Sequence, residues 1–195
     1  MRSYFDIIAS VLMSCVIFVS AESIQPPKNL ENFPTIRSTM GVISTAVAVM
    51  APLEGETASG TLQFFQSPDG VTLRGVFTGL SPNSEHALSV YEYGDLSAIS
   101  KHSIGKRYNP ERTDHAIPPN SDRPPGRFGN ITTNEYGEAL FELFDQTITI
   151  AGIKYPVLGR AVAIHELEDT QQVPSGGQVI AIGVIGIAKS TSNND

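Results

Sequence analysis

The amino-acid sequence predicts an all-β domain, a sandwich or flattened barrel, from three observations. Short apolar runs rich in β-branched and aromatic residues recur along the chain, which is typical of strands in a pleated sheet. Turn-forming sequences separate these runs, among them Pro68-Asp69-Gly70 and Pro82-Asn83. No stretch has the periodicity of an amphipathic helix over a convincing length.

The first half of the domain contains four predicted strands. Residues 46–50 form a continuous apolar run, as expected of a strand buried in a sandwich. Residues 61–66 and 71–77 flank the first of the two turns, and residues 87–93 follow the second. Their spacing favours consecutive antiparallel strands joined by short connections.

The composition changes between residues 94 and 129, where prolines are frequent and apolar runs are few. We expect this segment to be either a long ordered loop or a disordered insert, and long loops in compact domains usually carry function. Strands are predicted again at residues 138–144, 160–165 and 179–188.

The N-terminus resembles a secretory signal peptide covering residues 1–21. Arg2 supplies a positive charge, residues 7–19 form an apolar run that is short for a membrane span, and Ala21 offers a cleavage site. An uncleaved anchor is the alternative. The predicted organisation continues with an extended leader (22–43), the folded domain (44–189) and a polar, disordered tail (190–195). The expected location of the mature protein is secreted, extracellular.

Charge and cysteine content exclude several classes of function. The formal net charge of −7 makes nucleic acid and anionic membrane surfaces poor partners, because both attract basic patches. The single cysteine, Cys15, lies in the predicted signal, so the mature chain has no thiol for catalysis or for a disulfide. Hydrolase elbows, phosphate-binding loops, Cys-x-x-Cys pairs and His-Glu-x-x-His motifs are also absent from the sequence.

Four short motifs together resemble the copper/zinc superoxide dismutase family. They are Ser-Val-Tyr-Glu-Tyr-Gly-Asp at 89–95, Gly-Lys-Arg-Tyr-Asn-Pro at 105–110, Gly-Arg-Ala-Val-Ala-Ile-His-Glu at 159–166 and Gly-Val-Ile-Gly-Ile-Ala at 183–188. The resemblance covers about residues 45–189 and implies an eight-stranded Greek-key β-barrel. It also implies that the family's disulfide is missing, because its two cysteine positions correspond to Lys101 and Ile182.

The same resemblance implies that most of the copper site is lost. The four positions that hold copper-binding histidines in the family correspond to Ser89, Tyr91, Arg107 and His165, so one histidine of the four remains. A guanidinium is always protonated and cannot bind a metal, and serine and neutral tyrosine are poor copper ligands. We expect Tyr91 to fill part of the space that copper would occupy.

The zinc positions implied by the resemblance are altered in a similar way. Arg107 stands at the bridging position, His115 is kept, and Pro124 and Arg127 replace the third histidine and the aspartate. Asp169 matches the family's outer-shell aspartate, which orients ligand imidazoles. Our hypothesis is that Arg107 and Arg127 occupy the metal region and are neutralised by Asp169 and nearby carboxylates, because unpaired buried charge is costly.

Other positions support loss of catalysis. The loop between His165 and Gly183 is shorter than the family's, and Val179 stands where the family has an arginine beside copper. His86 is expected to make a structural hydrogen bond, and His102 to lie in a solvated loop. Asn130 begins an N-glycosylation sequon, although Gly-Asn-Ile-Thr is also a structural element of the family.

These observations predict a secreted superoxide dismutase-like protein without catalytic residues, a pseudoenzyme with a binding or structural role. No cofactor is expected; any metal would have to use His165 and His115. The alternative is an extracellular copper-dependent superoxide dismutase with an atypical site, and metal storage is a third, weaker interpretation. The expected partners are a second copy of the chain or a dismutase-like protein, with no nucleic acid and no membrane after signal cleavage.

Overall fold

The computed structural model describes residues 43–98, 103–113, 116, 118, 122–170 and 176–189. All of them belong to a unit that spans Val42–Asp195. The predicted signal peptide (1–21), the tail (190–195) and nearly all of the leader (22–43) lie outside the described residues. The described residues form no helix, and so none that could cross a membrane.

Nine strands make up the described unit. They are β1 (Thr45–Pro52), β2 (Ser59–Ser67), β3 (Gly70–Thr78), β4 (Glu85–Val90), β5 (Arg127–Thr132), β6 (Ala139–Asp145), β7 (Ala161–His165), β8 (Val179–Val184) and β9 (Gly186–Ile187).

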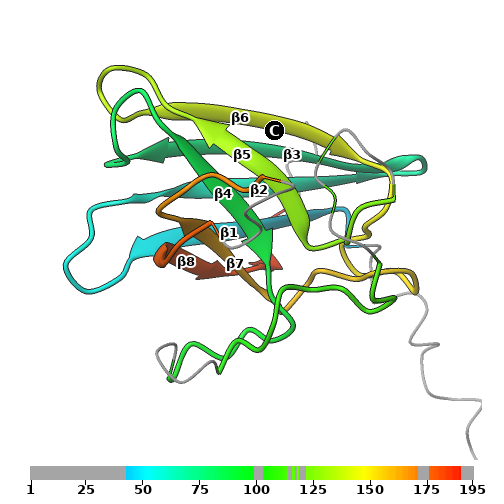
Figure 1. Cartoon of the computed structure of the whole chain (residues 1–195). Coiled ribbons are helices and arrows are strands. Elements are labelled where there is room, and N and C mark those ends of the chain that lie inside the picture. Colours follow the sequence, from blue (N-terminus) through cyan, green and yellow to red (C-terminus); the bar gives the residue numbers. More distant parts are fainter. Residues whose placement is uncertain are drawn as a thin grey trace, which may run out of the picture. The chain divides into compact units, whose positions relative to one another are not determined.

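The strands form an antiparallel, nearly closed barrel (Figure 1). Hydrogen-bonded neighbours follow the order β5-β4-β7-β8-β1-β2-β3-β6, and the short β9 pairs with β1. The two ends of this path, β5 and β6, also contact each other. The all-β, eight-stranded Greek-key barrel expected from the sequence is therefore confirmed.

The core follows from alternating side chains along the strands. In β1 the side chains of Ala46, Ala48 and Met50 are buried, whereas the intervening Val49 is 67% exposed. Phe64 of β2 faces the interior and packs against Phe128 of β5, with ring centroids 6.4 Å apart. This ring contact joins two strands that are not hydrogen-bonded neighbours.

Two details of the strand assignment differ from the sequence prediction. The segment 127–129, assigned to the long loop, begins strand β5. The alternation of buried and exposed residues that marks a strand is interrupted in β5. The register with β4 shifts between Leu88 and Ser89, and Gly129 has a φ of 88°. The predicted strand 179–188 is divided at Ile185 into β8, which pairs with β7 and β1, and the short β9, which pairs with another part of β1.

Candidate functional site

Neighbouring strands bring the described residues that the resemblance assigns to the copper site to one region of the barrel. Ser89 lies in β4, opposite Ala163 of β7. Tyr91 follows β4 and makes an isolated antiparallel bridge with Arg107, so the returning chain lies beside it. His165 ends β7. The barrel topology thus joins positions that are separated by up to 76 residues in the sequence, Ser89 and His165 being the most distant.

Tyr91, Arg107 and His165 form a contact cluster. The Tyr91 hydroxyl lies 3.2 Å from Nε2 of His165, and Nη2 of Arg107 lies 3.4 Å from the same nitrogen. The two rings are stacked, with centroids 6.1 Å apart. A guanidinium only donates hydrogen bonds, so Nε2 is the acceptor and Nδ1 carries the proton, which it donates to Gly177 O at 3.3 Å.

Burial keeps the two titratable rings of this cluster uncharged at neutral pH. Burial first, and then the neighbouring Arg107 cation, lower the pKa of His165 from 6.5 to about 4. Burial is also the largest cause of the raised pKa of Tyr91, and it outweighs the opposing effect of Arg107. The imidazole and the phenol are therefore neutral, and the guanidinium carries the charge of the cluster.

Asp169 joins both arginines of the site. Its Oδ2 accepts a hydrogen bond from Nε of Arg127 at 2.8 Å and one from Nη1 of Arg107 at 3.3 Å. Nη2 of Arg127 forms an ion pair with the other carboxylate oxygen, and both side chains are 1% exposed. The pairing of Arg107 and Arg127 with Asp169, which the sequence predicted, is confirmed.

Asn130 fixes the position of Asp169. Its side-chain oxygen accepts a hydrogen bond from the Asp169 amide at 2.8 Å, and its Nδ2 donates to the Asp169 carbonyl at 3.1 Å. The same Nδ2 lies 3.4 Å from a carboxylate oxygen of Glu85. Because Nδ2 is the atom to which a glycan would be attached, these contacts support the structural alternative for the sequon; glycosylation itself stays a prediction.

Arg123 is a buried residue near the site that the sequence analysis missed. It forms an ion pair with Asp145 of β6 at 2.5 Å and donates to the backbone carbonyl of Arg127 at 2.5 Å. It thereby holds the start of β5, from which Arg127 reaches Asp169. No local pattern distinguishes Arg123 from other loop arginines, because its carboxylate partner lies in a distant strand. Pro124 is buried and offers only its carbonyl, which accepts from the Arg127 amide at 3.1 Å.

The described residues do not fit the copper and zinc pair that the fold family implies. The His165 nitrogen that faces the cluster already accepts hydrogen bonds, and one of its donors is a permanent cation. Ser89 is buried with an unsatisfied hydroxyl. Among the described residues, no group of three or more histidine, cysteine, aspartate or glutamate side chains could hold a metal ion.

Several predicted positions lie elsewhere or outside the description. His115, His102 and Lys101 are outside the described residues, so the position of His115 relative to the other candidate residues stays untested. Nδ1 of His86 lies 3.0 Å from the His165 carbonyl, which confirms its structural hydrogen bond. Val179 packs against an apolar cluster that contains Ala161, Ala163 and Ile182.

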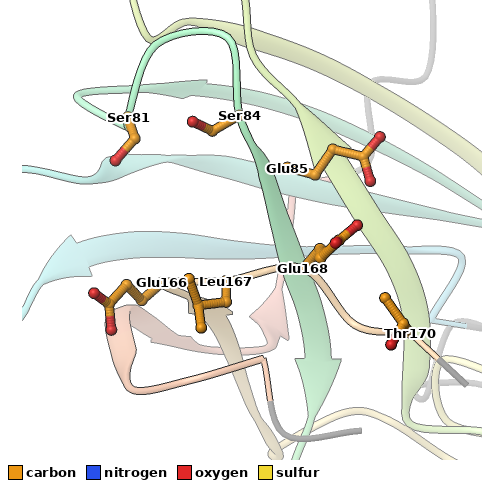
Figure 2. A pocket seen from close by; sticks show the side chains of 7 residues that line it. All are labelled: Ser81, Ser84, Glu85, Glu166, Leu167, Glu168 and Thr170. Carbon is orange, nitrogen blue, oxygen red and sulfur yellow. The ribbon is translucent and has the colours of Figure 1, made fainter. Parts of the chain in front are cut away.

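Of the cavities lined by described residues, two bear on the candidate site. The larger, about 730 Å³, is open and lies where β4 begins and the chain leaves β7; Figure 2 shows its lining side chains, which include Glu85, Glu166 and Glu168. Its charged side chains are all carboxylates. The smaller cavity, about 490 Å³, is lined by Arg107 and Arg127 and is therefore part of the candidate site.

Comparisons with known proteins agree with the fold and the motifs. The family model for copper/zinc superoxide dismutase matches residues 58–185. The chain is 32% identical over 161 residues to superoxide dismutase [Cu-Zn] 2 of Mesembryanthemum crystallinum, covering 77% of this chain and 99% of the relative. It is 31% identical over 156 residues to the human copper chaperone for superoxide dismutase, covering 74% of this chain and 55% of the chaperone.

A solved structure is also similar to this chain over most of its length. The crystal structure of the clock protein EA4 is similar to this chain with a TM-score of 0.65 and 35% sequence identity, covering 74% of this chain and 95% of that one. The family match extends over more than half of the sequence and includes all of the strands from β2 to β8. The chain therefore belongs to the copper/zinc superoxide dismutase family.

Proposed function

We propose that this chain is a secreted superoxide dismutase-like protein that does not dismutate superoxide and acts through binding or as a structural component. One observation carries the proposal: the guanidinium of Arg107, the residue that the sequence resemblance assigns to the bridging-ligand position, lies 3.4 Å from Nε2 of His165 and 3.3 Å from Asp169. A permanent cation there opposes a second, metal cation through Coulomb repulsion in a poorly solvated site.

The retained aspartate supports the same proposal. In a metal site of this family, the outer-shell aspartate would orient ligand imidazoles. Here Asp169 contacts two guanidinium groups and neutralises part of their charge. The polar network is thus built around arginines, and removal of either arginine would leave Asp169 with fewer partners rather than free a metal site.

Secretion and partners are part of the proposal. The apolar run at residues 7–19 and the small residues before the proposed cleavage after Ala21 support export. The relatives include an enzyme and a copper chaperone for superoxide dismutase, so the family contains proteins whose names describe different roles. A second copy of the chain, or another dismutase-like protein, is the proposed partner.

The test is a measurement of metal content and activity on the same sample. The mature protein would be loaded with copper and zinc, desalted, analysed for both elements and assayed for superoxide dismutation, beside an active family member treated identically. The expected result is far less than one copper per chain and no activity above free buffer. His165→Ala should leave both values unchanged.

The second candidate function is an extracellular copper-dependent dismutase with an atypical site. It is favoured by the retained His165 and by the 32% identity to a copper/zinc superoxide dismutase over 99% of that enzyme's length. Stoichiometric copper, together with activity that His165→Ala abolishes, would establish this function and reject the proposal above.

A further inference from the structure

The smaller cavity concentrates positive charge in an acidic protein. Its described lining includes Lys106, Arg107, Arg112 and Arg127 and one carboxylate, that of Glu92. The whole chain has 13 lysines and arginines against 20 aspartates and glutamates, so four cations around one cavity oppose the overall balance. A cavity of this charge attracts anions, and its walls reduce screening by solvent.

The described carboxylates near the cavity are fewer than its cations. Asp169 pairs with Arg107 and Arg127, and Glu92 accepts a hydrogen bond from the Lys106 amide at 3.0 Å. With Asp169 included, four cations face two carboxylates in the part of the chain that the structure describes. Nη1 of Arg127 is buried and has no hydrogen-bond partner in the described part of the chain. Such an atom is costly unless a further acceptor completes its contacts.

The loop that carries Arg112 is held in a specific conformation. Asn109 donates to the Thr113 carbonyl at 3.0 Å and accepts from the Thr113 amide at 3.1 Å. Within this turn Arg112 has a φ of 55°, a left-handed conformation that is uncommon for residues other than glycine. The side chains of Lys106 and Arg112 are exposed, in contrast to buried Arg127, so they can reach a ligand that enters from solvent.

We propose that this cavity binds a small, multiply charged oxyanion of the phosphate type. Planar guanidinium groups match such oxygens with paired, charge-assisted hydrogen bonds, and a lysine adds a compact charge. The inference deepens the proposed function and rests on it, because Arg107 and Arg127 line the cavity as well as the altered metal region.

The experiment is a calorimetric titration of the mature protein with inorganic phosphate and with glycerol 3-phosphate, each against sodium chloride at matched ionic strength. Saturable binding of one anion per chain is expected, with no comparable heat from chloride. Tighter binding of glycerol 3-phosphate than of phosphate would identify the source as an organic phosphomonoester; equal affinity would identify the free anion.

Two exposed variants and one matched control locate the site. Arg112→Gln and Lys106→Gln should each weaken the affinity about tenfold, as expected for loss of one charge-assisted hydrogen bond. Arg74→Gln removes the same charge from an exposed pair on β3 and should leave the affinity unchanged. No saturable binding, or affinity that all three variants leave unchanged, would overturn the inference.

These outcomes are separate from those of the metal analysis. A chain that is metal-free, inactive and unable to bind phosphate would retain the proposed function and reject only the anion site. A chain with stoichiometric copper and dismutase activity would reject the proposed function, whatever the phosphate titration gives.

Discussion

The apolar interior of the barrel and the Arg127–Asp169 pair are almost equally shielded from water. Leu62 and Phe64 are 0% exposed, and Arg127 and Asp169 are 1% exposed. The interior is stabilised by burial of apolar surface, which has no preferred direction. The region around Asp169 depends on directed ion pairs and hydrogen bonds, which must compensate for the removal of charges from water.

This difference indicates which buried residues can be substituted with little loss of stability and which cannot. An apolar core accepts residues of similar volume with small losses, whereas a buried polar network loses stability when any single member is missing. Nη1 of Arg127 and the Ser89 hydroxyl are buried without hydrogen-bond partners among the described residues. The polar region is therefore not optimised for stability alone, which is typical of a site with a function.

The largest expected effect is that of Asp169→Ala. This change leaves Arg127 buried without its counter-charge, so the free energy of unfolding should fall by about 3–5 kcal/mol, measured by urea denaturation. Glu142→Ala is the matched control, because it removes the carboxylate of the exposed Arg74 pair and should cost about 1 kcal/mol or less. Similar, small losses for both variants would show that water reaches the Asp169 pair.

Substitutions at Leu62 give the corresponding losses of stability for the apolar interior. Leu62→Ala creates a cavity in the core and should lower the free energy of unfolding by about 2–5 kcal/mol. Leu62→Met preserves most of the volume and should cost less than about 1.5 kcal/mol. Asp169→Asn also preserves shape, yet it should retain most of the loss of Asp169→Ala because the charge is gone. If Leu62→Met and Asp169→Asn lower the free energy of unfolding equally, the apolar interior and the Asp169 region do not differ in their tolerance of conservative changes.

The pH dependence of stability tests the buried imidazole. The pKa of His165 is lowered to about 4, so between pH 6.5 and 4 the unfolded chain binds a proton there and the folded chain does not. The contribution of His165 is complete above pH 6.5 and is lost as the pH falls. We expect a loss of about 2 kcal/mol between pH 7.5 and about pH 5.

The control for this prediction is His165→Gln, which removes the titrating group. Urea unfolding of both proteins at the two pH values isolates its contribution, since the other titrating groups are shared. If the two proteins lose the same stability on acidification, the folded pKa of His165 is not lowered.

Most strands, but not all of their pairing, could be predicted from the sequence. The run at 46–50 and the turn at Pro68-Asp69-Gly70 are local patterns, and both correspond to strand and turn in β1 to β3. Strand β5 was missed because Gly129 and the register shift opposite β4 interrupt its alternation. The division of β8 from β9 depends on long-range pairing, because β8 pairs with both β7 and β1 whereas β9 pairs with a different part of β1, and this is not a local property.

The sequence by itself determined the barrel class and the family motifs, and it predicts the replacement of histidines at positions 89, 91 and 107, because these depend on residue types and short spacings. The meeting of Arg107 and Arg127 on Asp169 was a hypothesis that only the tertiary structure could decide. Only the tertiary structure shows that Asn130 holds Asp169 and that Arg123 holds Arg127. It alone also shows that Lys106 and Arg112 line the same cavity as Arg107 and Arg127. The physical reason is that charge pairing and burial depend on distances across the closed barrel, between residues far apart along the chain.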